Sequence, residues 1–369
     1  MDENDKRSDI RQDTTIEDKI KDTAKNIHSK FNDFTGLEKL EGFSIGELFS
    51  EVFRKHDQQE VEEYFTTGTR FSTPALTDVD TRWPRPWVFF RVLTASLILY
   101  LLLHFSWACF KNTNFIPGLM TVGTVAIPLS TLVLFYELNV RRNVTLYQVV
   151  KLVLLGGITS LIFSSILFAI SLDSLGWMGP SIAALIEEPG KLLALVVVAR
   201  HNRRHYKLNG LLFGAAVGTG FAVFESLGYA FNVVLHSSLK TVVANAFGVA
   251  GGTAPVDAMV SIVVMRGVLS PFAHIIWTAI AGVAVWRVMG KDDFSVGMLA
   301  KPSFWHLFLV PVVLHAVWNA QFEIPMYGKY VVLGGVGWTV VLALVQEGLK
   351  QLRAEKIAAV ENGEEGVLT

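Results

Sequence analysis

Three charged residues lie in the middle of an apolar segment that is long enough to cross a membrane. Glu187, Glu188 and Lys191 occur inside the segment Trp177 to Ala199, and about 20 apolar residues span a bilayer. A charged residue at the centre of a membrane helix costs roughly 2.5 to 3.5 kcal/mol on insertion scales. Three charged residues in one membrane segment would not be expected unless they have a function. We therefore interpret this segment as the centre of an active site.

The spacing of these residues on a helix allows an ion pair. Glu187 and Glu188 precede Lys191 by four and three positions, so each acid can reach the lysine from its N-terminal side, which is the more favourable orientation. Pro189 lacks an N–H group and Gly190 lacks a side chain, so we expect the helix to bend beside the acids and to leave room for water or substrate. The alternative interpretation is a structural ion pair inside a helical bundle.

Further polar residues lie in later apolar segments. His274 and His315 occur in two of them, with Thr278 and Asn319 one helical turn beyond. A single histidine in such a segment is usually a packing residue, but two histidines and Glu225 fall in the same half of their predicted helices, where one cavity can hold them together with the acids above. Small residues on the helix face of Glu225 predict close contact with another helix; that face comprises Gly214, Gly218, Phe221, Ala222 and Gly228.

Composition and charge indicate a membrane protein with a charged N-terminal region. The chain is 51% hydrophobic, and residues 1–86 carry 19 acidic and 13 basic groups against 14 and 19 in the remainder. Residues 1–30 are predicted to be disordered or loosely helical, and residues 31–70 to form short amphipathic helices, one of them with a capping box at Ser44 and Glu47. We expect no signal peptide, because the first residues are charged throughout. The single cysteine, Cys109, excludes an intrachain disulfide.

Eight apolar segments are each long enough to span a bilayer, which predicts an all-α fold, a polytopic transmembrane helical bundle of about eight spans with a small helical N-terminal arm. Arginines and lysines gather in alternate connections, so both termini are predicted to be cytoplasmic. Residues 233–270 are interrupted by glycines and a proline, and we predict an external loop with a re-entrant or partial helix there. The eight segments are Trp87 to Phe110, Phe115 to Tyr136, Val149 to Leu172, Trp177 to Ala199, Leu208 to Phe231, Pro271 to Met289, Phe304 to Ala320 and Tyr330 to Gln346.

These patterns divide the chain into three regions. Residues 1–86 are predicted to be a cytoplasmic, partly disordered, amphipathic-helical region, residues 87–346 a transmembrane catalytic domain, and residues 347–369 a cytoplasmic tail. None of the residues suited to chemistry lies before residue 87.

In their order along the chain, the motifs resemble the PrsW family of intramembrane proteases, which belongs with the CAAX prenyl endopeptidases and the Abi proteins. EEPGK starts at Glu187, FAVFES at Phe221 and HAVWN at His315, and Arg266 precedes His274 by eight residues. The resemblance covers residues 176–320.

Two positions depart from the family pattern. Ser226 follows Glu225 where the family often has asparagine, and Asn319 stands where it often has aspartate. An amide at position 319 can orient water or a ligand but cannot act as a base.

The resemblance implies hydrolysis of a peptide bond by an activated water. Burial and a neighbouring acid suit Glu187 or Glu188 to the role of general base, with Lys191 keeping the other one ionised. Glu225 would complete the water site, and the two histidines with Asn319 would donate to the oxyanion. The candidate catalytic residues are therefore Glu187, Glu188, Glu225, His274 and His315, and the supporting residues are Lys191, Phe221, Arg266 and Asn319.

A zinc enzyme would use some of the same residues as ligands. Glu225, His274 and His315 would hold the ion and leave one position for water. Because the chain has no HExxH pair and its histidines come from different helices, we favour a metal-free glutamic mechanism without a cofactor over a zinc-assisted one.

The implied partners are a membrane protein or peptide substrate and the lipid bilayer, with no nucleic acid. The implied location is a bacterial cytoplasmic membrane. Two other functions use similar residues, namely a non-enzymatic membrane scaffold and a proton-coupled transporter. Transporters often contain internal repeats, and no internal repeat is evident in the sequence.

Overall fold

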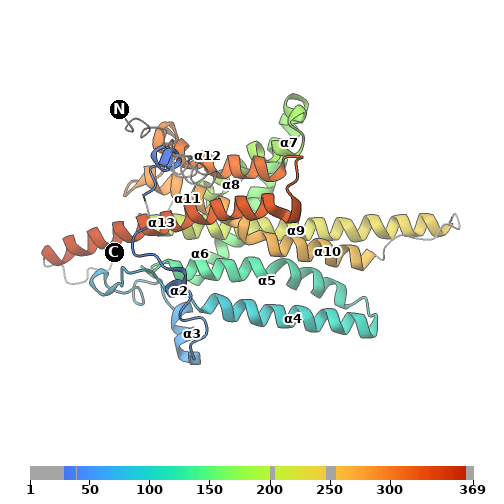
Figure 1. Cartoon of the computed structure of the whole chain (residues 1–369), viewed down its shortest axis with the longest axis horizontal. Helices are drawn as coiled ribbons and strands as arrows, with labels where there is room; N and C mark the ends of the chain where they lie inside the picture. The colour runs from blue at the N-terminus through green and yellow to red at the C-terminus, as the bar shows by residue number, and fades with distance from the viewer. Residues whose placement is uncertain (1–28, 39, 200–203, 247–254, 363–369) are drawn as a thin grey trace, which may run out of the picture. The chain divides into compact units, whose positions relative to one another are not determined.

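A computed structural model describes residues 29–38, 40–199, 204–246 and 255–362 (Figure 1). The regular secondary structure in these ranges is helical. Contacts divide the chain into two compact units, Met1–Glu38 and Lys39–Thr369. In the first unit residues 29–35 form a helix, in which Thr35 Oγ1 donates to the carbonyl of Phe31 at 2.7 Å. The second unit contains every other described helix.

Short helices open the second unit, as predicted for the region before residue 70. Helix α2 is Ile45–Leu48 and helix α3 is Gln58–Phe65. The Ser44 side chain caps α2 by accepting from the N–H of Glu47, while the full capping box forms at Asp57 and Glu60 of α3. A 3₁₀ turn, Leu76–Asp78, precedes the first long helix.

Six helical segments of the described chain are long and apolar enough to cross a membrane. Helices α8 (Ile182–Ala199) and α12 (Pro302–Asn319) have 18 residues each and are not among the six. Three charged residues lie in α8, and the histidines and Asn319 make α12 less apolar. The six are α4 (Val88–Phe110), α5 (Phe115–Leu138), α6 with α7 (Leu146–Lys151 and Gly157–Leu175, joined by a π-helical turn), α9 (Lys207–Ala246), α10 with α11 (Pro255–Leu269 and His274–Met289) and α13 (Gly328–Glu361).

Helix α9 is longer than predicted. The sequence interpretation ended this helix at Phe231 and placed a loop after it, but the helix continues to Ala246. That part of the prediction was wrong, because residues 233–246 contain neither glycine nor proline to stop a helix. The partial helix expected further on is α10, which lies along α9 (Figure 1).

Helices α9 and α11 form the centre of the bundle, and glycines let their backbones meet. A Cβ atom on Gly214 would lie 2.1 Å from the carbonyl oxygen of Thr278, and one on Gly218 would lie 2.5 Å from that of His274. The close helix contact predicted for these two glycines is therefore confirmed, whereas Gly228 has nothing within 4 Å. Since Glu225 lies seven residues after Gly218, this contact brings it beside the start of α11.

A buried carboxylate holds the start of α4 against α5. Glu137 Oε1 accepts from the N–H groups of Trp87 at 2.8 Å and Val88 at 2.9 Å, and Oε2 accepts from that of Phe89 at 2.9 Å. A negative charge at a helix N-terminus satisfies donors that have no partner within the helix. The two helices lie side by side from this point onward (Figure 1).

Candidate active site

The charged residues of α8 face the interior of the bundle. Glu188 and Lys191 are fully buried, and Glu187 is 7% exposed. Lys191 Nζ donates to Glu188 Oε1 at 2.5 Å. The sequence predicted that the lysine would pair with one of the two acids, and its partner is Glu188.

The local sequence of α8 sets how closely it packs. The turn before the helix includes Gly179 at φ 58° and ψ −144°, a conformation that residues with a Cβ rarely adopt. A Cβ atom on Gly190 would lie 2.6 Å from Ser164 Oγ of α7. Gly190 therefore admits α7 on one side of α8, next to the position where its acids face the core.

His315 is oriented by its contacts on α8 and α11. Its Nδ1 lies 2.7 Å from Glu188 Oε1, and its ring stacks on Trp277 with centroids 4.5 Å apart. The ammonium of Lys191 keeps Glu188 ionised, and an ionised carboxylate only accepts hydrogen bonds, so Nδ1 of His315 carries the proton. Its Nε2 is then an acceptor, and it lies 3.9 Å from Glu187 Oε2.

His274 is held from both sides of its ring at the first residue of α11. Its Nδ1 lies 3.1 Å from Lys191 Nζ, and its Nε2 lies 3.2 Å from Glu225 Oε2. An ammonium group only donates, so Nδ1 accepts and Nε2 donates to Glu225. Each histidine thus has a carboxylate on one ring nitrogen and turns the other nitrogen toward Glu187, whose Oε2 is 4.0 Å from His274 Nδ1.

A second ion pair joins α9 to α10. The guanidinium of Arg266 pairs with Glu225 and also donates from Nε to Ser226 Oγ at 3.0 Å. Ser226, which departs from the family pattern, therefore supports the arginine that holds Glu225. The Arg266 guanidinium also lies over the ring of Tyr229, 4.3 Å from its centroid.

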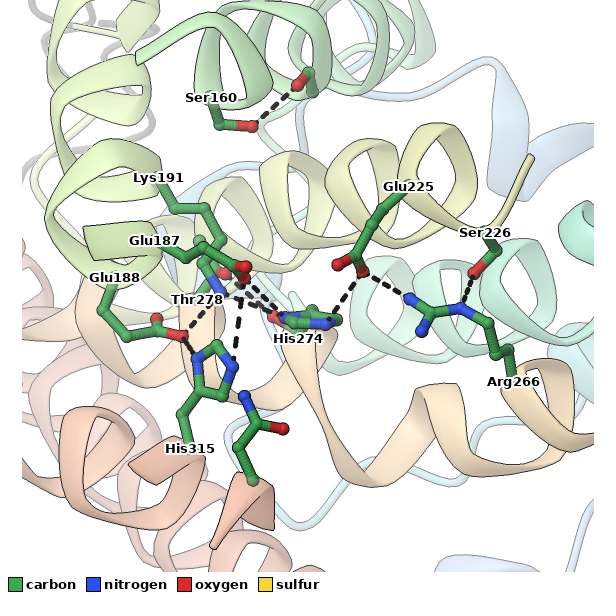
Figure 2. Close-up of polar contacts among 12 residues, drawn as sticks. Ser160, Glu187, Glu188, Lys191, Glu225, Ser226, Arg266, His274, Thr278 and His315 are labelled. Carbon is green, nitrogen blue, oxygen red and sulfur yellow. Dashed lines mark hydrogen bonds and ion pairs between the residues drawn. The ribbon is translucent and has the colours of Figure 1, made fainter. Parts of the chain in front are cut away.

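These side chains point toward one another from α8, α9, α10, α11 and α12 (Figure 2). The cluster contains three carboxylates, those of Glu187, Glu188 and Glu225, and two cations. Lys191 pairs with Glu188, and Arg266 pairs with Glu225. Glu187 has no such cation. Its Oε2 is buried without a hydrogen-bond partner, as is the Oε2 of Glu188, but Oε1 of Glu188 already accepts from both Lys191 and His315. A buried polar atom in that state requires a proton, a water or a cation.

A possible metal site surrounds this atom. One ligand atom from each of Glu187, His274 and His315 lies within 4.8 Å of the others. Zinc ligands sit about 2.0 to 2.1 Å from the ion, which places them roughly 3.3 Å apart, so a shift of about 1 Å would let them bind one. The three residues fit a metal ion provided that Nδ1 of His274 gives up the hydrogen bond that it accepts from Lys191. The zinc ligands expected from the sequence were Glu225, His274 and His315. In the structure Glu187 takes the place of Glu225, whose carboxylate contacts Arg266 and His274.

Other predicted residues lie at the edge of the cluster. The Phe221 ring lies 5.0 Å from that of His274 and 4.8 Å from Lys191 Nζ. The amide of Asn319 donates to the carbonyl of Pro180 at 3.4 Å. The sequence analysis did not select Trp277, although its position three residues after His274 places it on the same helix face.

A cavity of about 640 Å³ opens onto the cluster. Its lining includes His274, Arg266 and Ser226 of the cluster, Trp318 of α12, and residues 323–327, 329 and 330 from the connection between α12 and α13 and the start of α13. A peptide in this cavity would contact the cluster at His274 and Arg266.

Residues 145–346, just over half of the chain, match the family model described as PrsW family intramembrane metalloprotease. The matched segment contains every residue of the cluster. Comparison with curated proteins and with solved structures gives no match.

Proposed function

The chain belongs to the PrsW family of intramembrane proteases, and from this membership we propose that it hydrolyses a peptide bond in or near the membrane segment of a membrane protein, with Glu187 as the residue that activates water. The family and the apolar helices make it an integral membrane protein. A scaffold or a transporter is not favoured by this membership. We propose a bacterial cytoplasmic membrane as its location.

The observation that carries this assignment is the pair of acceptors formed by Glu187 Oε2 and His315 Nε2, 3.9 Å apart. Two acceptors that face each other at this distance suit a bridging donor, and a water molecule supplies two hydrogens. A carboxylate within reach of that water can take one of its protons. Glu188 cannot fill this role equally well, because its charge is already committed to Lys191 and His315.

In the proposed reaction Glu187 accepts a proton from the water while the water oxygen attacks the carbonyl carbon of the peptide bond. Glu187 then returns the proton to the leaving nitrogen as the C–N bond breaks. His315 orients the water, which replaces the oxyanion role that the sequence suggested for it.

A metal-assisted form uses the same centre. Glu187, His274 and His315 would hold the ion, and Glu188 and Glu225 would orient the two histidines through their remote nitrogens. When bound, such an ion polarises a carbonyl and makes its bound water more acidic. The description of the family as metalloproteases and the three converging ligand atoms support this form.

We further propose that α8 and α12 also cross the membrane, which makes eight spans with both termini cytoplasmic. Their 18 residues extend about 27 Å, close to the thickness of the hydrocarbon layer. Their charged and polar side chains face protein rather than lipid, which is how such residues are accommodated in membranes. The cavity then opens on the external side.

The direct test is turnover of a single-span membrane substrate by the purified full chain in lipid vesicles. We expect cleavage near one end of the span, abolished by Glu187→Gln. Inhibition by a chelator and recovery with added zinc would select the metal-assisted form, and unchanged turnover would select the glutamic one. Absence of cleavage across a broad set of membrane substrates would refute the protease assignment for this chain.

A further inference from the structure

A buried lysine lines the cavity that opens onto the catalytic cluster. Lys329, the second residue of α13, is 5% exposed. Its Nζ donates to the carbonyl of Ala320 at 2.9 Å and lies 4.9 Å from the ring centroid of Tyr330 and 5.2 Å from that of Phe322. Within the part of the chain that the structure describes, no carboxylate forms an ion pair with it.

Lys191, which is fully buried, pairs with Glu188, and the partly buried Arg266 and Arg287 pair with Glu225 and Glu347. Arg141 is buried and donates to a backbone carbonyl as Lys329 does, but unlike Lys329 it does not line the cavity. A buried cation without an acidic partner is costly, and inside a membrane protein such a residue is usually functional. The carbonyl of Ala320 uses one of the three donors on the ammonium and leaves donors for another acceptor.

The position of Lys329 in the first turn of α13 makes its unpaired positive charge less favourable, so an anion bound there would be more stabilising. A positive charge in the first turn of a helix opposes the helix dipole, whereas a negative charge there is stabilised. The carbonyl at the end of α12 offsets part of this cost, but it carries only a partial charge. An anion that entered the cavity would meet both the ammonium and the N-terminal end of α13.

On these grounds, and resting on the proposed protease function, we propose that Lys329 determines substrate specificity by pairing with an acidic side chain of the substrate. Lys329 and His274 line the same cavity. A rounded space of this volume is roughly 10 Å across, which corresponds to about three residues of extended chain. The acidic residue of the substrate should therefore lie within about three residues of the cleaved bond.

Aromatic contacts connect the lysine to the cluster. Tyr330 lies 4.5 Å from Trp318, Trp318 lies 5.5 Å from Trp277, and Trp277 stacks on His315. Of these rings, Trp318 and Tyr330 line the cavity, and they suit apolar side chains of the substrate between the acidic residue and the cleaved bond.

The test uses single-span reporter peptides in phosphatidylcholine vesicles, with Asp, Asn or Lys placed at one position at a time around the cleaved bond. We expect the full-length enzyme to cleave the Asp peptide with about 10- to 100-fold higher kcat/KM than the Asn peptide at one position, as charged hydrogen bonds allow. Lys329→Met should reduce this ratio to about one while the Asn peptide is still cleaved. Lys329→Glu should favour the Lys peptide, and Lys329→Arg should retain the original preference.

Lys111→Met is the matched control, since Lys111 is an exposed lysine at the end of α4, predicted to lie on the same side of the membrane and outside the cavity. It should leave the ratio unchanged. Equal cleavage of Asp and Asn peptides by the parent enzyme at every position overturns the inference without affecting the protease function, and this outcome does not require any variant to fold. A preference that persists in Lys329→Met, or that appears only with anionic lipid, also overturns it. Failure to cleave any peptide refutes the protease function and the inference with it.

Discussion

Glu187 Oε2 lies 3.9 Å from His315 Nε2, and both atoms are free to act as hydrogen-bond acceptors. Oε1 of the neighbouring Glu188 instead accepts hydrogen bonds from both Lys191 and His315. Two adjacent glutamates therefore have different environments, one suited to water and one to an ion pair. Their variants should separate catalysis from stability.

Replacing Glu187 by Gln should slow turnover by about 10² to 10⁴, the usual contribution of a general base, with little change in thermal stability. Replacing Glu188 by Gln should lower stability first, by about 3 to 5 kcal/mol, because Lys191 loses its buried partner. Turnover and thermal unfolding of both variants provide the comparison. Glu361→Gln, an exposed change at the end of α13 and outside the cavity, is the control. A Glu187→Gln variant that remains folded and cleaves normally would exclude Glu187 as the base.

Zinc titration of the purified protein should reveal which carboxylate belongs to the metal site. We expect binding to be lost in Glu187→Gln and His315→Ala, which remove a converging ligand atom. Glu225→Gln should weaken binding by only about 10- to 100-fold, as expected for a residue that orients a ligand. Calorimetry measures this without reference to activity. Complete loss of binding in Glu225→Gln together with normal binding in Glu187→Gln would favour the set expected from sequence.

The contact between α9 and α11 should be sensitive to a single methyl group. Gly214→Ala places a Cβ atom 2.1 Å from the carbonyl oxygen of Thr278, so the helices must separate at a cost of about 1 to 3 kcal/mol. Turnover should fall as well, because His274 begins the displaced helix. Gly228→Ala lies on the same helix and meets nothing within 4 Å. Equal melting temperatures and equal turnover for the two variants would contradict this packing.

Reporter insertions test the eight-span topology. A reporter after Glu323, between α12 and α13, should be external, and one after Asp292, between α11 and α12, should be cytoplasmic. A single-residue cysteine at each position, labelled with an impermeant reagent in intact cells, gives the same information with less perturbation. If both sites report the same side, α12 does not cross the membrane.

Most residues of the candidate site could be found from the sequence because the signal is local. A charge inside an apolar segment is unfavourable wherever that segment packs, so Glu187, Glu188, Lys191 and Glu225 were evident before any fold was known. Helical periodicity alone placed both acids within reach of Lys191. The small-residue face of α9 was likewise a property of one segment.

The tertiary structure decided how these residues divide their roles. Spacings of three and four residues are nearly equivalent on a helix, so the choice of Glu188 as the partner of Lys191 depends on where α12 places His315. The structure places Glu187, and not Glu225, among the three residues that could hold a metal ion. This depends on Arg266, which reaches Glu225 from a different helix. The burial of Lys329 beneath the connection between α12 and α13 has no local signal at all. In each case the deciding contact joins residues far apart in the chain, and its geometry follows from helix packing rather than from sequence spacing.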